Sequence, residues 1–219
     1  MTTIWLARHA ETATPHLIHG AESDIGLGEH GRRQAAAAAP WFRELDPDVV
    51  VSSGMIRAME TAAPIVALCE VPHEIEPNLH ERKVGRFSQR SGAEVDEVWS
   101  ETVRRWELGE ITYGYPGMES FSQIAARVVE AFHAVAARHA GKRVAMIAHG
   151  VVCKVLLLSL LKEYGPGDWT RLGRAINLSL SELVKDGETW SARRLLFVPE
   201  PVLEVNANRL EMGGKKSEA

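Results

Sequence analysis

The sequence has few cysteines, no surplus of positive charge and no long uninterrupted apolar run. Its two cysteines, Cys69 and Cys153, lie in apolar stretches of helical character, where a small buried hydrophobic residue is expected rather than a disulfide. This usage suits a reducing compartment, and we expect a cytoplasmic protein. The formal net charge is −4 and the basic residues are scattered, so nucleic acid is not an expected partner.

Signals for export or for a membrane are also missing. The first eight residues indicate a strand and lack the basic start and cleavage site of a signal peptide. The most apolar run, residues 151–161, is interrupted by Lys154 and Ser159 and is shorter than the roughly 20 residues that cross a bilayer. We therefore expect no export and no membrane partner, and we predict a buried helix over this run.

What the chain does contain is a regular alternation of short apolar runs and longer amphipathic ones. Its hydrophobic content of 45% and charged content of 25% are typical of globular proteins, and 219 residues suit one α/β domain. The alternation predicts an α/β fold with a mostly parallel central sheet and helices on both faces. The predicted strands span residues 3–7, 48–52 and 143–148, and the predicted helices span residues 29–45, 55–68, 120–139 and 151–161.

Three further segments complete the predicted domain, which spans residues 1–200. An insertion at about residues 82–118, with a helix at 93–108, is expected to cap the site. Two alternating runs, 175–183 and 189–197, flank an Asp-Gly turn and predict a hairpin that finishes the sheet, with one strand at its edge. Residues 201–219 show no pattern that could bury a face, so we expect a C-terminal tail with a mobile end.

Histidines and arginines follow three of the predicted strands. Arg8 and His9 come after the first strand, Arg57 lies just beyond the second, and His149 and Gly150 follow the strand at 143–148. Ligands bind at the carboxyl ends of strands in such sheets, so these side chains should converge. A cation in the first turn of a helix is unfavourable by roughly 0.3–1 kcal/mol unless an anion is near, and helix N-termini bind phosphate. The sequence predicts an oxyanion pocket, although each residue alone would equally fit a core histidine, a salt bridge or a surface cation.

The run Arg8–Thr12 resembles the Arg-His-Gly-Glu-Thr signature of the histidine phosphatase superfamily, in its phosphoglycerate-mutase-like branch. The resemblance extends in order over most of the chain. Two positions depart from it: Ala10 replaces the signature glycine, and Pro15 stands where many members carry an asparagine that helps to hold the phosphate. The other similar segments are residues 24–35, 52–62, 79–81, 116–120 and 148–150.

The resemblance implies a phosphoglycerate-mutase-like fold and a metal-independent, cofactor-independent phosphatase. His9 would attack phosphorus to give a phosphohistidine that water hydrolyses, and Glu81 would serve as general acid and base. The partner would be a small phosphorylated metabolite or phosphate ion. The phosphate hydrogen bond that Pro15 cannot make would be either missing or supplied by His16. The expected phosphate- and substrate-binding residues are Arg8, Arg57, His149, Gly150, His16 and Gly20.

Several alternatives stay open at this stage. Phosphoryl transfer of the phosphoglycerate-mutase type uses the same chemistry, and a pseudoenzyme that binds a phosphorylated ligand would fit Ala10 and Pro15. Apart from the resemblance, Glu81 also fits a solvated carboxylate. The oligomeric state is undecided, with a homodimer as one option. A rival metal site would use His9, His16, His19, Glu11 and Asp24.

Other residues have more modest expected roles. Glu11 and Asp24 would orient neighbours, and His16, His19 and His30 also fit surface or loop positions. Trp99 and Trp106, seven residues apart, should form the packing face of the helix at 93–108. Candidates for binding a second anionic group of the substrate are Arg86, Arg90, Arg104 and Arg105.

Overall fold

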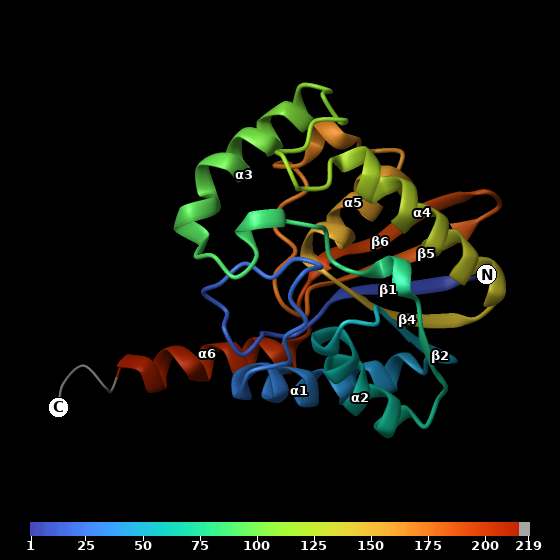
Figure 1. Cartoon of the computed structure of the whole chain (residues 1–219). Helices are drawn as coiled ribbons and strands as arrows, with labels where there is room; N and C mark the ends of the chain where they lie inside the picture. Colours follow the sequence, from blue (N-terminus) through green and yellow to red (C-terminus); the bar gives the residue numbers. More distant parts are fainter. Residues whose placement is uncertain (215–219) are drawn as a thin grey trace.

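A mixed six-stranded sheet forms the centre of the computed structural model, which describes residues 1–214, with side chains up to residue 208 (Figure 1). The strand order is β3-β2-β4-β1-β5-β6. The chain is therefore an α/β protein, as the alternation predicted. The strands are β1 (Thr3–Arg8), β2 (Val49–Ser52), β3 (His73–Ile75), β4 (Arg143–Ala148), β5 (Leu180–Asp186) and β6 (Thr189–Phe197).

The central strands are parallel, and the last two are antiparallel. β1 pairs in parallel with β4, with Thr3 opposite Arg143, and β4 and β3 both pair in parallel with β2. β5 runs antiparallel to both β1 and β6. The predicted hairpin is confirmed, with Gly187 in its turn at a φ of 58°, and β6 lies at the edge as expected.

Two parts of the sheet differ from the sequence prediction. β5 begins at Leu180 instead of residue 175, because residues 175–179 form a loop whose polar groups bind the end of β1. The Ala175 carbonyl accepts from Arg8 Nη1 at 2.8 Å, and Asn177 Nδ2 donates to the His9 carbonyl at 2.9 Å. β3 was not predicted, because it is a partly exposed edge strand of three residues without an apolar run.

Helices cover both faces of the sheet (Figure 1). Successive side chains of β1 point to opposite faces of the sheet. Ile4 and Leu6 pack into the core beneath α4 and α5, whereas Trp5 and Ala7 pack into the core beneath α1 and α2. None of the helices in the described part is long and apolar enough to cross a membrane. The helices are α1 (Glu29–Leu45), α2 (Ile56–Cys69), α3 (Gly92–Glu107), α4 (Phe121–Arg138), α5 (Gly150–Leu160) and α6 (Glu200–Gly214), with short 3₁₀ turns η1 (Pro77–Leu79), η2 (Gly85–Phe87) and η3 (Pro166–Asp168).

The expectation that residues 201–219 form a tail without a face to bury is wrong for the described part of that segment. Residues 200–214 form α6, which lies along α1 (Figure 1). Val202 is fully buried in the α1–α2 core, and Asn206 Oδ1 accepts from Gln34 Nε2 at 2.8 Å. These tertiary contacts compensate for weak helical patterning. The predicted mobile end, residues 215–219, lies outside the described residues.

Residues 82–118 contain η2, α3 and the loop that follows. α3 lies beyond the carboxyl end of β1 (Figure 1). Ser91 and Glu94 form a capping box at its start. This position is compatible with the capping role that the sequence predicted.

Candidate active site

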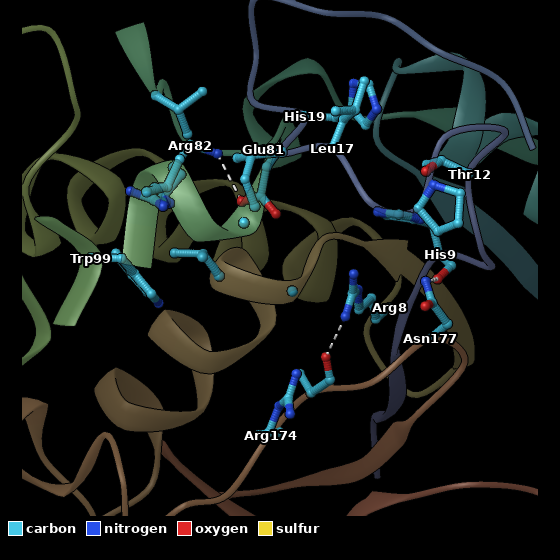
Figure 2. Close-up of a pocket in the computed structure, with 18 of the residues that line it drawn as sticks. Arg8, His9, Thr12, Leu17, His19, Glu81, Arg82, Trp99, Arg174 and Asn177 are labelled. Carbon is cyan, nitrogen blue, oxygen red and sulfur yellow. Dashed lines mark hydrogen bonds between the residues drawn. The ribbon is translucent and has the colours of Figure 1, made fainter. Parts of the chain in front are cut away.

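The carboxyl ends of β1 and β4 open into a pocket of about 430 Å³ (Figure 2). Arg8 is the last residue of β1 and His9 follows it, while Gly150 begins α5 directly after β4. Arg57 comes from the first turn of α2, and Glu81 from the loop after η1. All five line the pocket, so the structure brings these predicted residues together.

His9 is 5% exposed and held from both sides of its backbone. Its N–H donates to the Ala148 carbonyl at 2.9 Å, and its own carbonyl accepts from Asn177. In the ring, Nδ1 lies 2.6 Å from the Ala10 carbonyl. A carbonyl can only accept, so Nδ1 carries the proton and Nε2 presents a lone pair. Burial, reinforced by the Arg8 and Arg57 charges, holds the pKa of His9 well below its usual value, which keeps the ring neutral at pH 7.

Arg8 and Arg57 place two guanidinium groups around this imidazole. Burial lowers the pKa of each, and for each the charge that opposes this shift most strongly is Glu81. Arg57 is 1% exposed and donates through Nη1 to the Ser23 carbonyl at 3.1 Å. Arg8 Nε is buried with no hydrogen-bond partner among the described residues. A buried Arg57, and beside it a half-buried Arg8 with an unused donor at Nε, form a site for an anion.

His149 packs against His9, with ring centroids 5.1 Å apart in an edge-to-face arrangement. It is fully buried, and its Nε2 lies 2.9 Å from Ser53 Oγ. Burial and then the Arg57 charge hold the pKa of His149 well below its usual value. The ring is therefore neutral before an anion arrives, and Nδ1 has no partner within the described part of the chain.

Glu81 faces the arginines from the opposite wall. It is 9% exposed, and its Oε1 accepts from the Arg82 N–H at 2.8 Å. Figure 2 shows its side chain across the pocket from His9, with Arg8 between them. A carboxyl group so placed can exchange a proton with a group bound between it and His9.

The segment after His9 is fixed by close packing. Ala10 is fully buried and is not among the residues with a positive φ, so the backbone at the signature position tolerates a Cβ. Its N–H donates to Thr61 Oγ1 at 3.0 Å. A Cβ on Gly31 would lie 1.9 Å from the Glu11 carbonyl oxygen, so only glycine lets α1 approach this segment.

Three predicted phosphate-binding residues are not among those that line the pocket: His149, which packs against His9, and His16 and Gly20. His16 is exposed, because Pro15 and His16 are the central residues of a turn closed by the Leu17 N–H and the Thr14 carbonyl at 3.1 Å. Gly20 is buried against the chain at Val84, and its carbonyl accepts weakly from Arg57 at 3.5 Å. Gly20 therefore supports Arg57, and the geometry gives no support to direct phosphate binding by His16 or Gly20.

The roles expected for neighbouring side chains are partly confirmed. Asp24 Oδ1 accepts from the Ile56 N–H at 2.7 Å and so caps α2, which is an orienting role. Trp99 and Trp106 pack edge to face, with centroids 5.4 Å apart, as predicted, although Trp99 also lines the pocket. The four arginines proposed for a second anion lie elsewhere, bound to Tyr115 or to the carboxylates of Glu94, Glu101 and Glu110: Arg86, Arg90, Arg104 and Arg105.

Several pocket residues were not predicted from the sequence. His19 bridges Thr14 Oγ1 and Ser23 Oγ at 2.8 and 2.9 Å, which holds the loop beside Arg57. A lone lysine in an otherwise buried apolar helix was the available signal for Lys154, whereas Arg82 was hidden in a run of charges. The unpredicted lining residues that carry polar or aromatic groups include Thr12, His19, Arg82, Asp96, Lys154, Trp169, Arg174 and Asn177.

Neither a metal site nor a disulfide is indicated in the part of the chain that the structure describes. No group of three or more His, Cys, Asp or Glu side chains there is arranged to hold a metal ion, so the rival ligand set around His9 is not assembled. Cys69 and Cys153 are both free thiols, as the sequence indicated.

Comparison with known proteins gives a consistent result. The family model described as "Histidine phosphatase superfamily (branch 1)" matches residues 4–197. The chain is 32% identical over 196 residues to a metal-independent phosphoserine phosphatase of Arabidopsis thaliana, covering 87% of this chain and 79% of that protein. It is 30% identical over 198 residues to a probable phosphoglycerate mutase, GpmB, of Erwinia tasmaniensis, covering 88% and 89%. The native structure of a mycobacterial glucosyl-3-phosphoglycerate phosphatase superposes with a TM-score of 0.75 at 25% identity, covering 89% of this chain and 98% of that one.

Proposed function

The chain belongs to the histidine phosphatase superfamily, branch 1, and we propose that it hydrolyses a phosphomonoester through a phosphohistidine on His9. The observation that carries the proposal is the bond between His9 Nδ1 and the Ala10 carbonyl. It fixes the tautomer in which Nε2 is unprotonated, and the lowered pKa of His9 keeps that nitrogen available at neutral pH.

In the first step, the Nε2 lone pair forms a bond to phosphorus while the ester P–O bond breaks. Arg8 and Arg57 lie beside His9 and neutralise charge on the transferred oxygens. The negative phosphoryl group also favours protonation of His149, which would then donate from Nδ1. The buried Arg8 Nε and His149 Nδ1, both without partners among the described residues, support this assignment.

Glu81 completes the cycle as proton donor and acceptor. In its protonated form it gives its proton to the leaving alkoxide; as a carboxylate it then takes a proton from the water that attacks phosphorus and regenerates Nε2. Its place on the wall opposite His9 supports this role (Figure 2). The residues of this proposal supply nucleophile, charge and proton transfer, so the cycle needs no metal and no cofactor.

A phosphatase is favoured over the two alternatives. The relatives include two phosphatases, and a probable phosphoglycerate mutase keeps phosphoryl transfer as the second candidate. The pseudoenzyme hypothesis was based in part on Ala10, and it is weakened because Ala10 fits its position without a positive φ. The expected substrate is a small phosphorylated metabolite.

The test is phosphoenzyme trapping together with turnover. We expect wild type to release phosphate from a panel of phosphomonoesters and to incorporate ³²P in an acid-labile, base-stable form. His9→Ala should abolish both, by at least about 10³-fold. His133→Ala removes an exposed histidine of α4 and should change neither. Equal turnover by wild type and His9→Ala would contradict the mechanism, and transfer to added phosphoglycerate faster than hydrolysis would favour the mutase alternative.

A further inference from the structure

Two buried cations line the pocket away from His9. Arg82 is 5% exposed and Lys154 is 7% exposed, and both belong to the same pocket as the reacting groups. Figure 2 shows Arg82 and Trp99 on the side opposite His9, with Arg8 between. Arg8 and Arg57 already surround the position of the phosphoryl group, so these two additional cations call for a different explanation.

Each of these cations forms a cation–π contact with a tryptophan ring. The Arg82 guanidinium carbon lies 3.9 Å from the Trp99 ring centroid, and Lys154 Nζ lies 4.2 Å from that of Trp169. Lys154 Nζ also donates to the Trp169 carbonyl at 2.6 Å. These contacts hold both charges in place, but an aromatic face and a carbonyl neutralise a buried cation only in part.

Neither cation forms an ion pair with a carboxylate within the described residues. Arg82 receives longer-range support from Glu81, Glu119 and Glu22, yet its Nη1 is buried with no hydrogen-bond partner in the described part of the chain. Burial lowers the pKa of Arg82 to about 10. Burial likewise lowers the pKa of Lys154 to about 8, with Glu107 opposing the shift and Arg174 adding to it.

Unpaired buried charge is costly unless a ligand compensates it. The pocket of about 430 Å³ falls in the range of sites for small organic ligands, about 300–1,000 Å³, so it has room for more than a phosphoryl group. Exposed Arg174 at its rim adds a further positive charge, and exposed Asp96 a negative one. Positive charge therefore exceeds negative charge among the side chains of this half of the pocket.

We propose that Arg82 and Lys154, with Trp99 and Trp169 as walls, form a subsite for a second anionic group of the substrate, a carboxylate or a second phosphate. The substrate class is then a phosphomonoester with another negative group, and not a neutral alcohol phosphate. This inference rests on the proposed function, because the phosphoryl group must occupy the His9 end of the pocket. It assigns to Arg82 and Lys154 the role that the sequence gave to four arginines outside the pocket.

The experiment compares matched substrates that differ only in the second group. One pair is 3-phosphoglycerate and glycerol 3-phosphate, which differ in a carboxylate; the other is fructose 1,6-bisphosphate and fructose 1-phosphate, which differ in a phosphate. We expect wild type to prefer the doubly anionic member of at least one pair by roughly tenfold or more in kcat/KM, the effect of one or more charged hydrogen bonds. The preferred pair identifies the chemical source of the anion.

Variants then test the two cations. Lys154→Met and Arg82→Gln should each reduce that preference by roughly tenfold, mainly through KM, while the singly anionic substrate keeps its kcat/KM within about threefold. Lys162→Met removes an exposed lysine just beyond α5 and should preserve the preference. A merely structural role would instead lower turnover of both members together, which would overturn the subsite.

Failure of the subsite and failure of the proposed function are distinguishable. Equal kcat/KM within both pairs in an active wild type would overturn the subsite and leave hydrolysis intact. If no ester is turned over, calorimetric binding of the same pairs to His9→Ala decides the subsite independently. Tighter binding of the doubly anionic member, lost in the Lys154→Met background, supports it, and equal binding refutes it.

Discussion

The Ala10 N–H, directly after the proposed nucleophile, depends on one side chain of α2. It donates to Thr61 Oγ1 at 3.0 Å, and the same hydroxyl donates to the Arg57 carbonyl at 2.7 Å. Thr61 is fully buried, so it joins the segment that carries His9 to the helix that carries Arg57. This hydroxyl group therefore helps to fix the relative position of nucleophile and arginine.

We expect Thr61→Val to lower the free energy of unfolding by about 1–3 kcal/mol, because the buried Ala10 N–H loses its acceptor. It should also lower kcat more than it raises KM. Urea unfolding and steady-state kinetics measure the two effects. Thr102→Val is the matched control, since Thr102 is also buried and its hydroxyl donates to the Val98 carbonyl within its own helix. Equal destabilisation by both variants would contradict the role of Thr61.

At the scale of single residues, Arg82 and Lys154 are pocket residues that the sequence did not predict. Arg8, His9 and His149 were predictable because strand ends in parallel sheets converge. Arg82 lies in a run of charges that fits a solvated loop, and its burial depends on the stacking of Trp99, a contact between segments 17 residues apart that no local pattern encodes.

At the scale of elements, α2 begins without a capping side chain of its own. Its N-cap residue is Met55, and the cap comes instead from Asp24, whose Oδ1 accepts from the Ile56 N–H at 2.7 Å. Asp24 also places negative charge near Arg57. One carboxylate thus acts on both the start of the helix and the arginine in its first turn.

Two substitutions separate these effects. Asp24→Ala should lower the free energy of unfolding by about 0.5–2 kcal/mol, whereas Asp24→Asn keeps an acceptor oxygen and should cost much less. If the charge beside Arg57 matters for ligand binding, both variants should bind inorganic phosphate more tightly than wild type, since a competing anion is gone. Urea unfolding and phosphate titration measure these outcomes; equal destabilisation by both variants would exclude the capping role.

The helix α6 reaches the signature segment through α1. Asn206 Oδ1 accepts from Gln34 Nε2 at 2.8 Å and from His30 Nε2 at 3.1 Å, and Gln34 Oε1 accepts from the Glu11 N–H at 2.9 Å. A residue near the end of the described chain therefore orients the side chain that holds the backbone two residues after His9.

Asn206→Ala should lower the free energy of unfolding by roughly 1 kcal/mol, because two donors lose their shared acceptor, and should reduce kcat slightly through Gln34. Asn208→Ala, at an exposed position of the same helix, carries the same change in helix propensity and should have no such effect. Thermal or urea unfolding compares the two. A loss of the same size in both would mean that the bond to α1 contributes nothing.

The elements that the sequence predicted and the elements that it did not predict differ in what stabilises them. α1 and β4 carry their own periodicity, and their observed limits equal the predicted ones. α6 contains Pro201 and two asparagines and is held by Val202 and Asn206 against α1. β3 is held by its pairing with β2 and by the bonds of Glu74 to Arg138 and His139. Tertiary contacts stabilise both missed elements, and a local pattern does not reveal such contacts.

At the scale of the whole molecule, the pocket is assembled from parts that are distant in sequence. β1, α2, the loop after η1, α5 and the loop before β5 each supply a wall, so the site exists only when the complete sheet has formed. The cost of burying its histidines in neutral form is therefore part of the global free energy of unfolding. That coupling makes stability depend on pH.

His9 and His149 have pKa values well below 6.5 in the folded protein, whereas in the unfolded chain they titrate near 6.5. Below pH 6.5 the unfolded state binds more protons than the folded state, so stability should fall as the pH falls, by up to about 1.4 kcal/mol per pH unit for each histidine. Urea unfolding between pH 5 and 7.5 measures this slope.

His9→Gln should remove part of the slope and His9→Gln/His149→Gln most of it, whereas His133→Gln should leave it unchanged because His133 is exposed. Because carboxylate titration is common to all four proteins, an identical slope in wild type and the double variant would mean that the two imidazoles are not held neutral. Inorganic phosphate should reduce the loss of stability at low pH in wild type. A bound anion favours the protonated imidazole, so the folded state then binds protons that it excludes without the anion.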